Sequence, residues 1–124
     1  MNLNAKTAAV VLGVVFLAVG ILGFFPNPLV SATGLFAVDT AHNVVHIVSG
    51  LFLLAGAYAG LGSALALKIL GVVYAIVAIL GLVAGGDMLL GIIMINQADN
   101  WLHVVLAVVI LAAGFLLEDE PAMA

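Results

Sequence analysis

The sequence contains four long apolar runs, and each is long enough to cross a lipid bilayer as a helix. They cover residues 6–25, 40–60, 64–84 and 98–117, with at most one charged residue in each. A bilayer core of about 30 Å is crossed by about 20 helical residues. The runs show no strict alternation of apolar and polar residues, so they predict helices rather than barrel strands. We therefore expect an all-α membrane protein, a bundle of four transmembrane helices.

The composition excludes the other broad classes of protein. Hydrophobic residues make up 67% of the 124 positions and charged residues 6%, whereas a soluble domain carries about 25% charged residues. A soluble domain of this composition would expose large apolar patches, and a disordered chain needs far more charge. Two basic residues cannot form a patch that binds nucleic acid. The chain has no cysteine, which excludes disulfides, thiol nucleophiles and iron–sulfur clusters.

The sequence also repeats itself. Residues 11–24 align with residues 69–82, and eight of the fourteen positions are identical. The segment AHNVVH at 41–46 aligns with ADNWLH at 98–103 at nearly the same offset. We therefore predict one membrane domain over residues 1–124, built from two helix–loop–helix repeats at about 8–60 and 64–117. Each repeat crosses the membrane twice, so both insert the same way up and their symmetry axis follows the membrane normal.

The few charged residues indicate an orientation. Lys6 and Lys68 fall on the side of the membrane shared by both termini, whereas Asp39, Asp87 and Asp99 fall on the other side. Because basic residues stay on the cytoplasmic side, both termini are predicted to be cytoplasmic, in a prokaryotic cytoplasmic membrane.

The segments on the outer side are unusually apolar for loops. Residues 27–39 and 85–97 are rich in aliphatic side chains, so we expect short interfacial or re-entrant stretches that pack against the bundle. Tyr58 and Trp101 fall near opposite ends of their spans, where aromatic side chains anchor helices at the membrane interface.

Small residues recur at helix-packing spacings. Such residues let helix backbones approach closely in lipid. The set comprises Gly13, Gly20, Gly56, Gly60, Gly71 and Ala78. Two interpretations remain open, packing within the bundle and a contact with a second copy or another membrane protein.

Polar residues cluster at one end of the second and fourth helices. Steps of three, four or seven residues place each set on a single helix face. The two sets are Asp39, His42, Asn43 and His46, and Asn96, Asp99, Asn100 and His103. At about 1.5 Å per residue, the deepest histidines, His46 and His103, lie roughly 10 Å further in than the first residue of each set. At that depth they must face protein rather than lipid.

Four interpretations of this cluster remain open. In the first, the residues form a polar seam in which neutral side chains bond across the helix interface and fix its register, with Asp39, Asn43, Asn96 and Asn100 as members. In the second, four residues bind a divalent metal ion such as Zn²⁺. They are His42, His46, Asp99 and His103.

In the third interpretation, His46 and His103 are axial ligands of a haem, with room made by Ser49 and Gly50, although no basic residue lies on that side to meet the propionates. In the fourth, the ionisable residues line a path for protons or a small solute. No nucleophile and base pair supports an enzyme active site.

The two polar segments also carry a family resemblance. The run from Gly34 to Gly50, which contains HNxxH, together with DNWLH at 99–103, resembles the DUF4383 family of small bacterial four-helix membrane proteins. The resemblance covers about residues 8–117 and implies the fold and the membrane location. It implies no activity.

Together these observations favour a non-enzymatic multi-pass membrane protein, either a structural or accessory subunit or a small oligomer. Its expected partners are the lipid bilayer and a second copy or another membrane protein. Metal or haem binding through the histidines is the alternative, and a solute path within an oligomer is the third reading.

Overall fold

The computed structural model describes residues 3–84 and 88–119 and contains four long helices. They are α1 Ala5–Leu22, α2 Thr40–Tyr58, α3 Ser63–Ala84 and α4 Gln97–Leu116. Each is long and apolar enough to cross a membrane, which confirms the predicted all-α four-helix class. The first helix ends three residues earlier than predicted, because the N–H groups of Phe24 and Phe25 bond to carbonyls three residues back and tighten the chain into turns. Asp87 lies outside the described residues.

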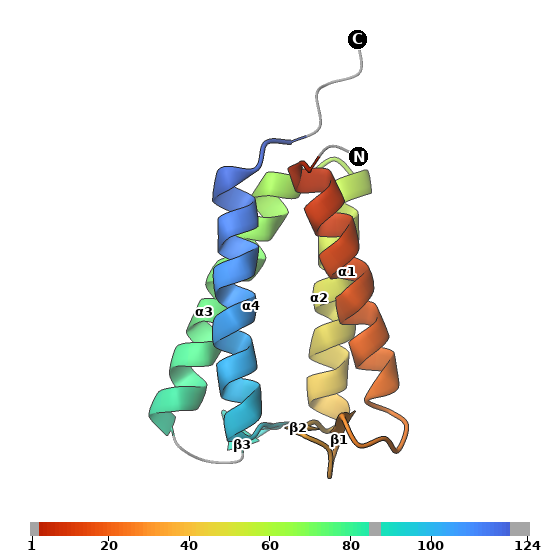
Figure 1. The fold of residues 1–124 in the computed structure, drawn as a ribbon, viewed down its shortest axis with the longest axis vertical. Coiled ribbons are helices and arrows are strands. Elements are labelled where there is room, and N and C mark those ends of the chain that lie inside the picture. The colour runs from red at the N-terminus through yellow and green to blue at the C-terminus, as the bar shows by residue number, and fades with distance from the viewer. Residues whose placement is uncertain (1–2, 85–87, 120–124) are drawn as a thin grey trace.

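The helices form two antiparallel pairs, α1 with α2 and α3 with α4 (Figure 1). The start of α1, the turn between α2 and α3, and the end of α4 lie at one end of the bundle. There the amide of Ala5 donates to the carbonyl of Glu118 over 2.8 Å. The segments that follow α1 and α3 lie at the opposite end, where α2 and α4 begin.

Those two segments contain short strands rather than helices. The strands are β1 Val30–Ser31, β2 Phe36–Ala37, β3 Met88–Leu89 and β4 Ile93–Met94. β1 pairs with β2 in parallel, and β3 pairs with β4 antiparallel. Val30, Val38, Leu89 and Ile95 are buried. The loops thus pack against the bundle through these four residues. Other large apolar side chains of the loops are exposed, namely Leu29, Leu35, Met88, Leu90 and Ile92.

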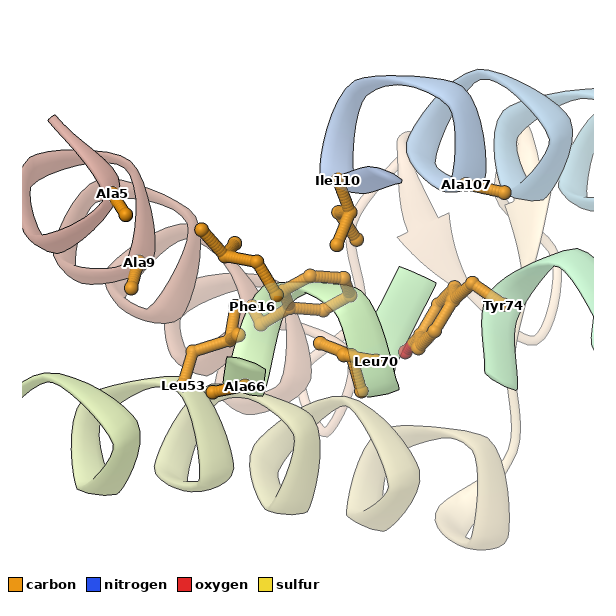
Figure 2. Close-up of a cluster of buried hydrophobic side chains, with 10 residues drawn as sticks. Ala5, Ala9, Phe16, Leu53, Ala66, Leu70, Tyr74, Ala107 and Ile110 are labelled. Atoms are coloured by element: carbon orange, nitrogen blue, oxygen red, sulfur yellow. The ribbon is translucent and has the colours of Figure 1, made fainter. Parts of the chain in front are cut away.

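The core fills the space between the two pairs. All four helices contribute side chains, and Phe16 lies among residues of the other three (Figure 2). Its ring meets that of Tyr74 edge-on at 5.2 Å between centroids. Phe16 and Tyr74 occupy the same position in the two repeats. Their contact therefore joins the halves at equivalent points.

Most of the small residues lie where helices approach each other. A side chain at Gly13 would lie 3.1 Å from the carbonyl oxygen of Gly50 in α2, and one at Gly20 would lie 2.9 Å from the carbonyl oxygen of Asn43. A side chain at Gly71 would lie 2.7 Å from Cγ of the Leu111 side chain and 3.1 Å from its backbone nitrogen in α4. Three members of the set remain. Gly56 contacts Ala66 of α3, and Ala78 is buried. Gly60 is the one member of the set that does not lie at a helix contact.

Gly60 lies beyond the end of α2 and is not a packing residue. Its φ of +89° is the left-handed conformation that glycine adopts readily, and no atom lies within 4 Å of where its side chain would start. It serves the turn. Tyr58 and Trp101, at the two ends of the bundle, are 67% and 57% exposed, and the ammonium of Lys6 lies 4.8 Å from the centre of the Tyr58 ring.

Candidate metal centre

The first residues of the two polar sets are helix caps that also tie the halves together. Asp39 accepts the amide of His42 at the start of α2 over 2.9 Å, and its other oxygen accepts the amide of Met94 in β4 over 3.1 Å. Asn96 caps α4, and its Nδ2 donates to the carbonyl of Leu35 over 2.9 Å. Each cap therefore bonds to the loop of the other repeat. This exchange fixes how the two hairpins meet.

Asp99 has a different role from the one its spacing predicts. Its carboxylate accepts the amide of Asn96 over 3.0 Å, while the Asn96 side chain accepts the amide of Asp99 over 2.9 Å. This reciprocal pair is a capping box, which satisfies two helix-end amides at once. Among the described residues, Asp99 is not in the group whose ligand atoms converge. The four-ligand prediction therefore reduces to three histidines.

The two asparagines lie against glycines that the sequence analysis did not identify. A side chain at Gly23 would start 1.9 Å from Oδ1 of Asn43, and one at Gly81 would start 2.1 Å from Oδ1 of Asn100. These two amide oxygens have no conventional hydrogen-bond partner in the described structure. They instead lie against glycine Cα–H groups, which act as weak donors. The signal was available, because Gly23 and Gly81 occupy the same position in the repeat.

The three histidines come together in the interior. Each is less than 5% exposed, and one ring nitrogen from each lies within 4.8 Å of the others. The rings of His42 and His46 are 4.5 Å apart between centroids, and that of His103 lies 5.6 Å from His42 and 6.4 Å from His46. Two residues come from α2 and one from α4, so the cluster bridges the hairpins.

The hydrogen bonds around the cluster leave ring nitrogens available. Nδ1 of His42 lies 2.6 Å from the carbonyl oxygen of Met94. A carbonyl only accepts, so Nδ1 carries the proton and Nε2 of the neutral ring keeps a lone pair. Nδ1 of His46 and Nδ1 of His103 are buried and have no partner in the part of the chain that the structure describes. Buried polar atoms without partners are rare in native proteins.

A small cavity adjoins the histidines between α2 and α3. It measures about 60 Å³, and all three histidines, Ser49 and Tyr74 line it, together with aliphatic side chains. Ser49 Oγ lies 3.0 Å from Oη of Tyr74. Tyr74 is a site residue that the sequence analysis did not predict, because in an apolar span it is typical of ordinary core packing.

The structure does not accommodate the haem of the third interpretation. The ring of His42 lies close to both His46 and His103, and Ser49 is bonded to Tyr74. Gly50 does not make room for a ligand, because its Cα packs against the backbone of Gly13 in α1. Cofactor pockets measure about 300–1,000 Å³, far more than the cavity here. A single ion fits the histidines better than a porphyrin.

Four helices long and apolar enough to cross a membrane, among the residues that the structure describes, define the class as a small helical membrane protein. A family model with the description "Domain of unknown function (DUF4383)" matches residues 6–116. The chain therefore belongs to this family, as the HNxxH and DNWLH segments predict. No curated protein and no solved structure matches the chain.

Proposed function

We propose that this membrane protein binds a transition-metal ion between its helices through His42, His46 and His103. The observation that carries the proposal is the convergence of three buried imidazoles whose nitrogens lie within 4.8 Å of one another. Neutral imidazole is a preferred ligand of Zn²⁺, Cu and Ni ions.

The environment of the rings supports an ion over simple packing. Nδ1 of His46 and Nδ1 of His103 are buried without a partner in the described structure, and an ion bound at either atom removes the cost of about 1–3 kcal/mol for a buried group left unpaired. His42 is already oriented, because its second nitrogen donates to Met94 as metal-binding histidines commonly do. Nitrogens bound to zinc at about 2.0–2.1 Å in a tetrahedral site lie roughly 3.3 Å apart. Binding then requires the side chains to move by about an ångström.

A structural or accessory subunit without an ion is the second candidate. The reciprocal caps support it, because Asp39 and Asn96 already hold the hairpins together through the exchanged loops. In that case the histidines only fill the interface between α2 and α4. Asp39 and Asn96 hold the two hairpins together, whereas the three histidines converge on one point. Substitutions can therefore distinguish the metal-binding function from the structural one.

Metal content and affinity test the proposal directly. The protein is purified in detergent without a nickel resin, its metal is measured, and Zn²⁺ affinity is determined by competition with a chromophoric chelator. We expect one ion per chain. His103→Ala should lose more than the roughly 10- to 100-fold in affinity that removal of an outer-shell partner costs.

Asp99→Asn is the matched control, because it removes a carboxylate four residues from His103 while its amide oxygen can still accept the amide of Asn96. It should leave Zn²⁺ affinity nearly unchanged. If the wild-type protein binds no Zn²⁺, the metal proposal is wrong. If Asp99→Asn loses Zn²⁺ as His103→Ala does, the three-histidine ligand set is wrong.

The orientation belongs to the same proposal. The start of α1 with Lys6 and the early part of α3 with Lys68 lie at one end of the bundle, and we place that end in the cytoplasm on the basic-residue rule. The metal centre then lies nearer the outer face, with its three histidines about 3–9 Å from the starts of α2 and α4.

A further inference from the structure

Two cavities flank the histidines, and the repeat relates them. One, of about 110 Å³, lies between α1 and α4, and its walls include Phe16, Leu106 and His46. The other, of about 60 Å³, lies between α2 and α3, and its walls include Tyr74, Ser49 and the three histidines. Tyr74 takes the place of Phe16 in the repeat, and Ser49 takes the place of Leu106. The hydroxyls of Tyr74 and Ser49 therefore line the cavity between α2 and α3, and the described residues that line the cavity between α1 and α4 include no counterpart to them.

The direction of the hydrogen bonds follows from the number of protons. The hydroxyl of Ser49 donates to the carbonyl of Val45 in the preceding helical turn over 2.8 Å. A serine hydroxyl has a single proton. The 3.0 Å contact with Tyr74 is therefore a bond in which Tyr74 donates and Ser49 accepts. Oη of Tyr74 keeps a lone pair and has no proton left to donate.

We infer that the metal centre has an open coordination position on this cavity, which holds a small exchangeable ligand of the water or hydroxide class that donates a hydrogen bond to Tyr74. The inference rests on the proposed metal binding. Three protein ligands with one open position are typical of reactive zinc sites, whereas structural sites have four protein ligands. The cavity is large enough, since one water needs about 10–15 Å³ of such space.

The chemistry of the walls selects a ligand that carries a proton. Besides the histidines, the two hydroxyls are the polar groups contributed by the lining residues, and the rest are aliphatic. Water or hydroxide on the ion has a proton to give to Tyr74, whereas azide has none. The site should therefore favour water over azide, although both are small enough to enter.

Azide titration of the Co²⁺-loaded protein tests this preference. The visible absorption of tetrahedral Co²⁺ reports replacement of the exchangeable ligand. We expect azide to change the spectrum and to bind Tyr74→Phe about 2- to 12-fold more tightly than wild type, the equivalent of one net hydrogen bond that favours water. Without azide, Co²⁺ affinity should fall by no more than this same factor, because the lost hydrogen bond belongs to the water-bound form. Tyr58→Phe removes the same hydroxyl at an exposed position and should behave as wild type.

Ser49→Ala gives an independent check, because it frees the Tyr74 proton to donate to azide. It should also raise azide affinity. A Co²⁺ spectrum that azide does not alter would overturn the inference and leave the metal proposal standing. A phenolate charge-transfer band that Tyr74→Phe abolishes would overturn it too, because Tyr74 would then fill the position itself. Failure of Co²⁺ and Zn²⁺ to bind at all would refute both proposals.

Discussion

Gly81→Ala tests the close contact between Gly81 of α3 and the Asn100 side chain near the start of α4. A methyl group at this position would lie 2.1 Å from the Asn100 amide oxygen, and Asn100 is only 2% exposed. The amide must therefore move. Its Nδ2 now donates to the carbonyl of Gly81 over 3.2 Å and to Oε1 of Gln97 over 3.0 Å, and the movement breaks or lengthens both bonds.

The expected loss of stability follows from three contributions. Overpacking of a filled interior costs about 1–3 kcal/mol, and two hydrogen bonds contribute about 0.5–1.5 kcal/mol each. The better helix propensity of alanine returns about 1 kcal/mol. We expect Gly81→Ala to lower the free energy of unfolding by about 3 kcal/mol, measured by titrating the protein with SDS in mixed micelles.

Two further variants make the test specific. Gly81→Ala combined with Asn100→Ala removes the clashing amide and should recover part of the loss, so the two substitutions are not additive. The methyl group of Gly71→Ala on the same helix would lie 2.7 Å from Cγ of Leu111 and does not touch Asn100, so Asn100→Ala should not relieve its loss of stability. A loss below about 0.5 kcal/mol in Gly81→Ala, or a double variant that is less stable than Gly81→Ala, would refute the reasoning.

The remaining predictions concern the caps, the ion and the orientation. Asp39→Ala removes the cap of α2 and leaves the Met94 amide unpaired, so the free energy of unfolding should fall by about 2–3 kcal/mol in the same assay. Zn²⁺ at 100 times its dissociation constant should stabilise the wild type by about 2.7 kcal/mol, and a chelator should reverse this. In the cysteine-free chain, an impermeant maleimide added to intact cells should label Ile92→Cys but not Leu61→Cys; the reverse pattern would invert the orientation.

The helices were predictable because each one depends on the apolar composition of its own segment of sequence. A run of about 20 apolar residues has few alternatives in a membrane, and the four predicted spans agree with the observed helices to within three residues at each end. The convergence of His42, His46 and His103 was partly predictable as well. Their spacing and the repeat place them on facing stripes, although only the structure shows that their nitrogens meet.

The role of Asp99 could not be separated from metal binding by spacing alone. A carboxylate four residues before His103 suits a metal ligand, and the same residue three positions after Asn96 suits a capping box. Which role applies depends on where α4 begins, and the boundaries of helices are the least certain part of a sequence pattern. Because Asn96 is the N-cap of α4, Asp99 occupies the capping-box position.

The exchanged loops and the hydroxyls of the cavity depend on contacts between distant residues. The bond from Met94 to Asp39 joins positions 55 apart, and that from Asn96 to Leu35 joins positions 61 apart. No local pattern encodes them. The role of Tyr74 likewise depends on a distant residue, because its hydroxyl bonds to Ser49 on another helix. A comparison of the repeats shows that Tyr74 differs from Phe16, but not which side chain its hydroxyl meets.

X-ray absorption of the Zn²⁺-loaded protein at the zinc edge tests the metal centre most directly. It counts ligands and identifies imidazole by the scattering from its outer ring atoms. The proposal predicts three imidazole nitrogens at about 2.0–2.1 Å plus one oxygen ligand without outer-ring scattering in the wild type. It predicts two imidazoles in any zinc that His103→Ala retains. A wild-type zinc site with fewer than three imidazoles, or one unchanged in His103→Ala, would contradict it.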